Sequence, residues 1–325
     1  MEQNKSKNYL FGLLVAFLAG IFAFFIAKAL KIPHADPLLV GLIVGMVLKL
    51  LIGSRESLIP GLVLAPSIFI PIGAILYGAI NLNFVEFAKV KGSFVVLTLL
   101  IILTYFLIIL TLGRILNQKK EITYLTATGS AVCGASAIAI ISQALKAEPD
   151  DVSISLISVF LSACFGLFIL FPFLVSLFGL DNYTFALLSA TTLQFTGFVK
   201  GAVASLPKDL KTLALSVKAV RYLALLIAIP LFSSFLKKRV HIPWFLWAFL
   251  GGGLIFSFFP QVAKILTPIF KPLLDVLWTV AMTAIGLNAD IRALFSDNGM
   301  KALLMAFLGF FGALLVFFLG ISFIK

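Results

Sequence analysis

Residues 129–136 read Gly129-Ser130-Ala131-Val132-Cys133-Gly134-Ala135-Ser136 and lie inside the apolar segment Ile122–Leu145. That segment is long enough to cross a bilayer, for which about 20 apolar residues suffice. Its middle is nevertheless built from small residues, and two glycines stand where helix propensity favours Ala or Leu. In lipid, such a weak point is tolerated only where protein packs on it or a water-filled cavity meets it. The stretch therefore predicts either a tight helix crossing or a broken helix at a binding site, as at mid-membrane depth in secondary transporters.

The composition indicates a polytopic membrane protein. Of the 325 residues, 62% are hydrophobic and 12% are charged, and the mean hydropathy is +1.16, whereas about a quarter of a soluble domain is charged. We predict an all-α fold with about 11 transmembrane helices in a single transmembrane domain, residues 1–325, which leaves no room for a soluble catalytic domain. The candidate spans are Tyr9–Leu30, Pro37–Ile52, Gly61–Leu82, Ser93–Gly113, Ile122–Leu145, Val152–Phe178, Tyr183–Leu206, Thr212–Leu236, Trp244–Phe259, Val262–Asn288 and Met300–Ile324.

The charge and the cysteine content indicate which partners and cofactors are to be expected. The net charge is +12, but the basic residues are spread through short loops, so the expected partner is the lipid bilayer and not a nucleic acid. Lys and Arg are more numerous on the side of the N-terminus, which places that terminus in the cytoplasm. Cys133 and Cys164 both lie inside predicted helices and give no disulfide framework or metal-ligand spacing. No cofactor is expected, and for want of catalytic residues we do not expect an enzyme.

An offset of 207 residues relates several features of the two halves. It separates His34 from His241, Asn81 from Asn288 and Gly92 from Gly299. Seven spans separate the matched features, so the copies would run in opposite directions, as in inverted-repeat transporters with discontinuous helices. The alternative is that membrane chains share such residues at span ends. The stretch at Gly129 has no mate at this offset, and the other interrupted span, 191–201, is the only substitute.

Ionisable residues inside spans are functional candidates by default. Lys271 and Asp275 stand at i and i+4 and are expected to neutralise each other. Lys218, Arg221 and Lys200 have no such partner, so they predict a positive interior that suits an anion. The alternative for each is that it reaches the membrane interface.

Neutral polar residues complete the predicted site. Hydroxyls and amides donate to oxyanions, although Ser and Thr in membrane helices usually bond to their own backbone or join helices. The predicted substrate-binding residues are Gly129, Ser130, Cys133, Gly134, Ser136, Thr192, Gln194, Thr196, Lys200, Lys218 and Arg221, with Asn81 and Asn288 as second-tier candidates.

Four ordered segments carry a resemblance to a known family. Residues 129–137, the run Val217-Lys218-Ala219-Val220-Arg221, residues 242–245 and residues 281–287 resemble the YeiH-like sulfate exporter family of bacterial inner-membrane proteins. That family is similar in fold to bile acid/sodium symporters and cation/proton antiporters, in which a mobile core with crossing broken helices moves against a scaffold. The resemblance implies a core of residues 61–178 with parts of 183–236 and 262–324, and a scaffold of residues 9–52 and 243–259. The seventh span of the family carries a His followed by an acid, whereas residues 190–196 here have neither.

The sequence thus predicts a secondary active transporter of a small anion, such as a sulfate-like oxyanion, a sulfonate or an organic anion, with export as one direction. The alternatives are a cation/proton antiporter, which would depend on Asp275, and a channel-like anion pore. The sequence does not decide whether H⁺ or Na⁺ serves as a coupling ion, or whether the protein forms a homodimer. The expected location is the bacterial inner membrane.

Overall fold

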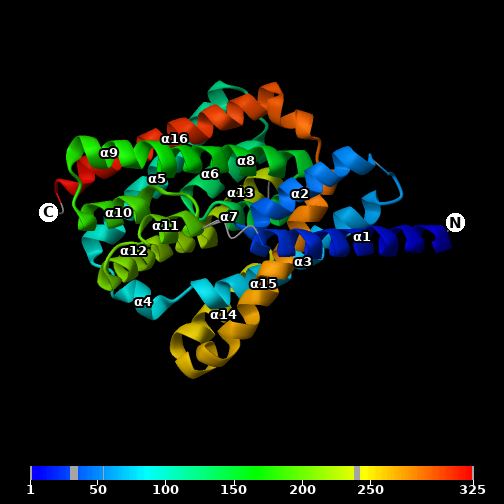
Figure 1. Cartoon of the computed structure of the whole chain (residues 1–325), viewed down its shortest axis with the longest axis horizontal. Helices are drawn as coiled ribbons and strands as arrows, with labels where there is room; N and C mark the ends of the chain where they lie inside the picture. Colours follow the sequence, from blue (N-terminus) through cyan, green and yellow to red (C-terminus); the bar gives the residue numbers. More distant parts are fainter. Residues whose placement is uncertain (1, 30–35, 54, 238–241, 324–325) are drawn as a thin grey trace.

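The computed structural model describes residues 2–29, 36–53, 55–237 and 242–323, and every regular element within these ranges is a helix (Figure 1). The two termini lie at opposite ends of the long axis. His34 and His241 lie outside the described residues.

Seven helical segments are long and apolar enough to cross a membrane. This confirms an all-α polytopic membrane protein. Two of them are interrupted helices: a π-helical turn, Gly166–Leu170, joins α8 to α9, and a 3-10 turn, Arg221–Leu223, joins α12 to α13. The long segments are α1 (Glu2–Ala29), α3 (Ile59–Asn81), α5 (Gly92–Ile115), α8 (Pro149–Phe165) with α9 (Phe171–Phe178), α12 (Lys208–Val220) with α13 (Ala224–Lys237), α15 (Pro260–Asn288) and α16 (Asp297–Ile321). The shorter helices are α2 (Pro37–Ile52), α4 (Phe84–Ala88), α6 (Lys120–Ala131), α7 (Ala135–Leu145), α10 (Asn182–Thr192), α11 (Thr196–Ala202) and α14 (Trp244–Phe258).

The predicted fifth span is a helical hairpin. Lys119, just before α6, forms ion pairs with Glu148 at 2.7 Å and with Asp151 at 2.8 Å, although these acids follow the end of α7. The hydrogen bond from Lys119 lowers the pKa of the Glu148 carboxyl below its ordinary value. Because α6 begins where α7 ends, the chain enters along α6, turns at residues 132–134 and returns along α7. The expectation that Ile122–Leu145 spans the membrane as one element is therefore wrong, while the expected break within residues 129–136 is present.

The predicted seventh span also turns back, from the opposite end of the molecule. The rings of Phe94 and Tyr183 lie 6.1 Å apart, so α10 begins where α5 begins. After a break at residues 193–195, α11 leads back to α12, which packs along α10 and against α4. We call the pair α6 and α7 the first hairpin and the pair α10 and α11 the second hairpin. The two breaks are the hairpin tips.

The helices pack in two groups. One group consists of α1, α2, α3, α14 and α15, and the other contains both hairpins with α5, α8, α12, α13 and α16. Glycines permit the closest approaches within the first group: a Cβ on Gly286 would meet the Leu42 carbonyl, and one on Gly78 would meet the Phe249 carbonyl. Residues 61–82 and 262–288, which we expected in the core, pack with the first group. Movement of one group against the other stays a prediction.

Candidate functional site

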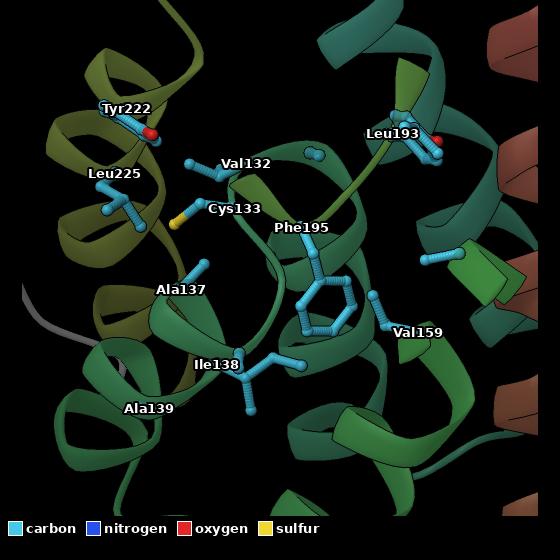
Figure 2. Packing of buried hydrophobic residues seen from close by; sticks show 14 of the residues in the cluster. Val132, Cys133, Ala137, Ile138, Ala139, Val159, Leu193, Phe195, Tyr222 and Leu225 are labelled. Carbon is cyan, nitrogen blue, oxygen red and sulfur yellow. The ribbon is translucent and has the colours of Figure 1, made fainter. Parts of the chain in front are cut away.

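The hairpin tips meet in the interior. Gly134 has φ of +68°, a left-handed conformation that favours glycine, and a Cβ there would lie 2.8 Å from the Phe195 ring of the second tip. Figure 2 shows the Phe195 ring beside Ile138 and Val159, and Cys133 pointing toward the helix that carries Tyr222 and Leu225. The glycine thus allows the turn and also the close approach of the two tips.

Lys218 joins the two tips through its ammonium group. Its Nζ donates to the carbonyl oxygens of Val132 at 2.9 Å, Leu193 at 2.7 Å and Gln194 at 2.9 Å. The side chain is fully buried. Since an ammonium has three N–H donors, these three contacts use all of them.

Arg221, one turn further along, binds the last carbonyls of α6 and α10. Its Nε donates to Ala131 at 2.8 Å and its Nη2 to Ser130 at 2.5 Å, while Nη1 donates to Thr191 at 2.9 Å and to Leu193 at 2.8 Å. Arg221 is also fully buried.

These contacts explain why two cations are stable in the interior. The last carbonyls of a helix have no partner within it and carry about half a negative charge. Lys218 and Arg221 supply donors and charge to two such ends. Tyr105 assists by donating from its hydroxyl to Thr192 O at 2.8 Å, and its ring lies 5.6 Å from the Arg221 guanidinium carbon. In the described part of the chain neither cation forms an ion pair with an acid.

We expected these cations to face a solute directly, and the geometry gives them a different immediate partner. The donors point at backbone carbonyls of the tips, because the breaks in α6 and α10 expose those carbonyls. The donors of the two side chains are therefore taken up by backbone carbonyls of the tips.

The other predicted residues divide by location. Thr192 donates to its own helix, at Leu188 O, 2.7 Å away. The Gln194 side chain donates to Ser162 Oγ at 3.3 Å. Gln194 Oε1 and Ser130 Oγ are buried without a hydrogen-bond partner among the described residues. Gly129 gives space, since a Cβ there would meet Ile138.

Thr196 and Ser136 open the second arms of the two hairpins. The Thr196 hydroxyl lies 2.9 Å from that of Tyr222. The Tyr77 hydroxyl lies beside Cys133 and Ser136, and the rings of Tyr77 and Tyr222 are 5.8 Å apart. We call these five residues, Tyr77, Cys133, Ser136, Thr196 and Tyr222, the tip cluster.

Three predicted residues lie away from the hairpin tips. Lys200 is exposed near the end of α11, with Lys271 and Asp275 as its charged neighbours. Asn81 ends α3 and donates to its own helix, at Tyr77 O, 3.0 Å away. Asn288 ends α15, where its carbonyl accepts from Lys49 at 2.9 Å. Their expected convergence with the tips is not seen.

The sequence did not point to the three tyrosines at the hairpin tips. Tyr77, Tyr105 and Tyr222 lie in apolar segments, where tyrosine ordinarily indicates a membrane interface. A signal did exist for Tyr222, which directly follows Arg221. Groups of His, Cys, Asp or Glu suited to a metal ion are absent from the described residues.

A cavity of about 1150 Å³ lies between the two groups of helices. Its walls are α3, the end of α7, the start of α8 and the start of α14, and its polar side chains are Ser67, Ser142, Gln143 and Lys146. The tip cluster does not line it.

Comparison with known proteins gives one family. The family model described as conserved hypothetical protein 698 matches residues 11–306. The chain is 26% identical to a UPF0324 membrane protein of Bacillus cereus, over 98% of both chains. It is 28% identical to one of Archaeoglobus fulgidus, over 95% of this chain and 91% of the relative, and 27% identical to one of Helicobacter hepaticus, over 94% of both. No solved structure matches the chain.

Proposed function

Because the chain belongs to the conserved hypothetical protein 698 family, whose relatives here are named membrane proteins, we propose from its buried cations that it is a secondary transporter of a small anion. The observation that carries the proposal is the position of Lys218 and Arg221, both fully buried at the meeting point of two helical hairpins and without an acidic partner in the described chain. The resemblance to YeiH-like sulfate exporters adds a bacterial inner-membrane location and the substrate range of sulfate-like oxyanions, sulfonates and organic anions.

The charge balance at the tips favours an anion. Two full positive charges face two helix C-termini of about half a negative charge each, so about one positive charge remains uncompensated in a poorly solvated region. An anion at the tips restores neutrality. A cation would add to the excess.

The tip cluster supplies the geometry for binding. The hydroxyls of Tyr77, Ser136, Thr196 and Tyr222 are neutral donors and lie where α7 and α11 begin. Donors of this kind bind an oxyanion without a change in their own protonation. The cluster lies between the hairpins and α3, so displacement of one helix group against the other would open it.

Alternating access is consistent with an inverted repeat whose elements follow one another in a different order in the two halves of the chain. In this proposal α2, α3 and α5 match α14, α15 and α16, and the mate of the first hairpin is the second hairpin, which precedes α14 in the chain. Leu42 and Phe249 are 207 residues apart. The Leu42 carbonyl of α2 lies against Gly286 of α15, and the Phe249 carbonyl of α14 lies against Gly78 of α3. Because the second hairpin precedes α14 in the chain, it does not lie 207 residues after the first hairpin.

The antiporter alternative is weaker. It would depend on Asp275, which is half-buried on α15 and has Lys271, Lys28 and Lys200 as charged neighbours. The residue does not belong to the tip cluster.

Anion binding and uptake test the proposal. Purified protein is screened for thermal stabilisation by sulfate, sulfite, thiosulfate, methanesulfonate and small carboxylates, with and without sodium. The anion that stabilises it is then followed as uptake into proteoliposomes. Tyr77→Phe and Ser136→Ala each remove one donor and should weaken the apparent affinity about tenfold, the equivalent of roughly 1.4 kcal/mol.

The matched controls are Tyr9→Phe and Ser322→Ala, which change exposed residues far from the tips and should leave affinity unchanged. Absence of both stabilisation and uptake for every anion would reject the proposed function. Equal loss in the controls would reject the site.

A further inference from the structure

The cavity between the helix groups lies on the path to the tip cluster. On α3 its lining reaches inward to Pro71, and on α7 it reaches Ser142. Tyr77 lies six residues beyond Pro71, and Ser136 lies six residues before Ser142. At about 1.5 Å per residue, the tip cluster is roughly 9 Å further along both helices. The two walls of the cavity therefore lead to the same residues.

The wall formed by α3 is suited to water. Pro66 and Pro71 lie inside this helix and line the cavity. A proline has no N–H for the carbonyl four residues earlier, so the carbonyls of Leu62 and Ser67 lose their helical partners. Both residues also line the cavity. Freed carbonyls within a membrane protein are tolerated where other protein groups satisfy them or where they meet water, and their position on the cavity wall favours an aqueous cavity.

The outer end of the cavity lies where the N-terminal helix begins. Its rim includes Lys146 and Pro149, next to the ion pairs of Lys119 that close the first hairpin. Leu62, on the opposite wall, follows Gly61, and a Cβ on Gly61 would meet Gly12 of α1. The cavity therefore opens at the end of the molecule where α1 starts.

The lining suits an anion with an apolar part. Among the described residues that line the cavity Lys146 is the only charged side chain and none is acidic. Trp244, Phe245 and the two prolines give apolar surface, and Ser67, Ser142 and Gln143 give neutral polar groups. A dianion such as sulfate gains nothing from the apolar surface, whereas the hydrocarbon part of a sulfonate or carboxylate does.

We propose that this cavity is the vestibule through which an organic monoanion, a small sulfonate or carboxylate, reaches the tip cluster from the face that carries the N-terminus, and that Tyr77 with Cys133 and Ser136 closes its inner end. This inference rests on the proposed function for its ligand, but not for the sidedness of the cavity.

Single-cysteine labelling in proteoliposomes tests the sidedness. In a Cys133→Ser, Cys164→Ser background, Gln143→Cys is exposed to a membrane-impermeant methanethiosulfonate added to one face at a time, and a tag at the N-terminus marks the faces. We expect reaction only from the N-terminal face. The control Ser322→Cys, an exposed site at the end of α16, should react only from the other face. Reaction of Gln143→Cys from the C-terminal face, or none without denaturant, overturns the vestibule.

The native Cys133 tests the connection to the tips. It is only 2% exposed, so its modification in a Cys164→Ser protein reports separation of α7 from α3. We expect slow modification from the N-terminal face that is reduced about tenfold by saturating methanesulfonate, less by sulfate and not by the neutral dimethyl sulfone. No reaction of Cys133 overturns the connection, and better protection by sulfate or equal protection by the sulfone overturns the ligand class.

The labelling pattern requires no transport. If Gln143→Cys is labelled from the expected face but no anion is bound or taken up, the proposed function fails and the vestibule remains. If anions are transported and Gln143→Cys is labelled from the wrong face, the vestibule fails alone.

Discussion

At the residue scale, two cations were predictable as buried charges, but their partners were not. The sequence places Lys218 and Arg221 inside an apolar helix without a nearby acid. What it does not reveal is that α6 and α10 both end beside them, because every residue carries a carbonyl and only the fold decides which carbonyls lack a partner. The tyrosines of the tip cluster were missed for a similar reason, since one polar atom on a large apolar ring leaves no periodic signal.

Substitution of either cation should destabilise the protein. Arg221→Gln and Lys218→Met leave carbonyls of both tips without donors, and we expect a loss of about 3–5 kcal/mol, the range for breaking buried charged contacts. Arg221→Lys keeps the charge with fewer donors and should lose less. Melting temperature in detergent measures the effect. Lys208→Met, at an exposed position of the same helix segment, should leave it unchanged, and a similar drop there would refute the assignment.

Gly134→Ala should also be destabilising. The positive φ and the nearby Phe195 ring oppose a Cβ, and we expect a loss of about 1–3 kcal/mol. Gly251→Ala is the matched control, because the added Cβ meets nothing within 4 Å and alanine favours helices. Thermal unfolding of the two variants checks this, and equal melting temperatures would contradict it.

At the scale of elements, hydrophobicity predicted the helices well and their paths less well. Ile122–Leu145 and Tyr183–Leu206 are long enough to be spans, and only the break was readable from the sequence. Whether a chain continues or turns back at a break depends on contacts such as Lys119 with Glu148, which join residues 29 positions apart. No local pattern encodes such a pairing.

Labelling distinguishes a hairpin from a span. Lys120→Cys and Glu148→Cys, placed singly in the cysteine-free background, should react with an impermeant thiol reagent from the same face, because both lie at the base of the first hairpin. Asn182→Cys and Lys208→Cys should both react from the opposite face. A first pair labelled from opposite faces would restore the predicted single span.

At the scale of the whole molecule, the 207-residue offset pairs helices in the proposed repeat but does not give the order of the elements. Asn81 ends α3 and Asn288 ends α15, the two helices that the proposed repeat pairs. A constant offset assumes the same order of elements in both halves, so it cannot pair the two hairpins that the proposal matches. Packing against α5, α12 and α16 places them in the fold, and that information is not local.

The proposed repeat makes a quantitative prediction about packing. Gly78→Ala and Gly286→Ala push a methyl group onto Phe249 O and Leu42 O in the two equivalent helix pairs, and overpacking of this kind loses about 1–3 kcal/mol. We expect similar drops in melting temperature for both variants. Gly92→Ala, with open space around it, should show none. A drop for one variant only would contradict the equivalence.

The shared contacts of Lys218 and Arg221 restrict how the molecule can move. Each side chain holds carbonyls from both hairpins, so drawing one tip away from the other would strand buried charges and break several hydrogen bonds at once. In the proposed alternating access the two hairpins would therefore travel together with α12. In that proposal the surface that slides is the contact of the tip cluster with α3, where the rings of Tyr77 and Tyr222 can separate without exposing Lys218 or Arg221.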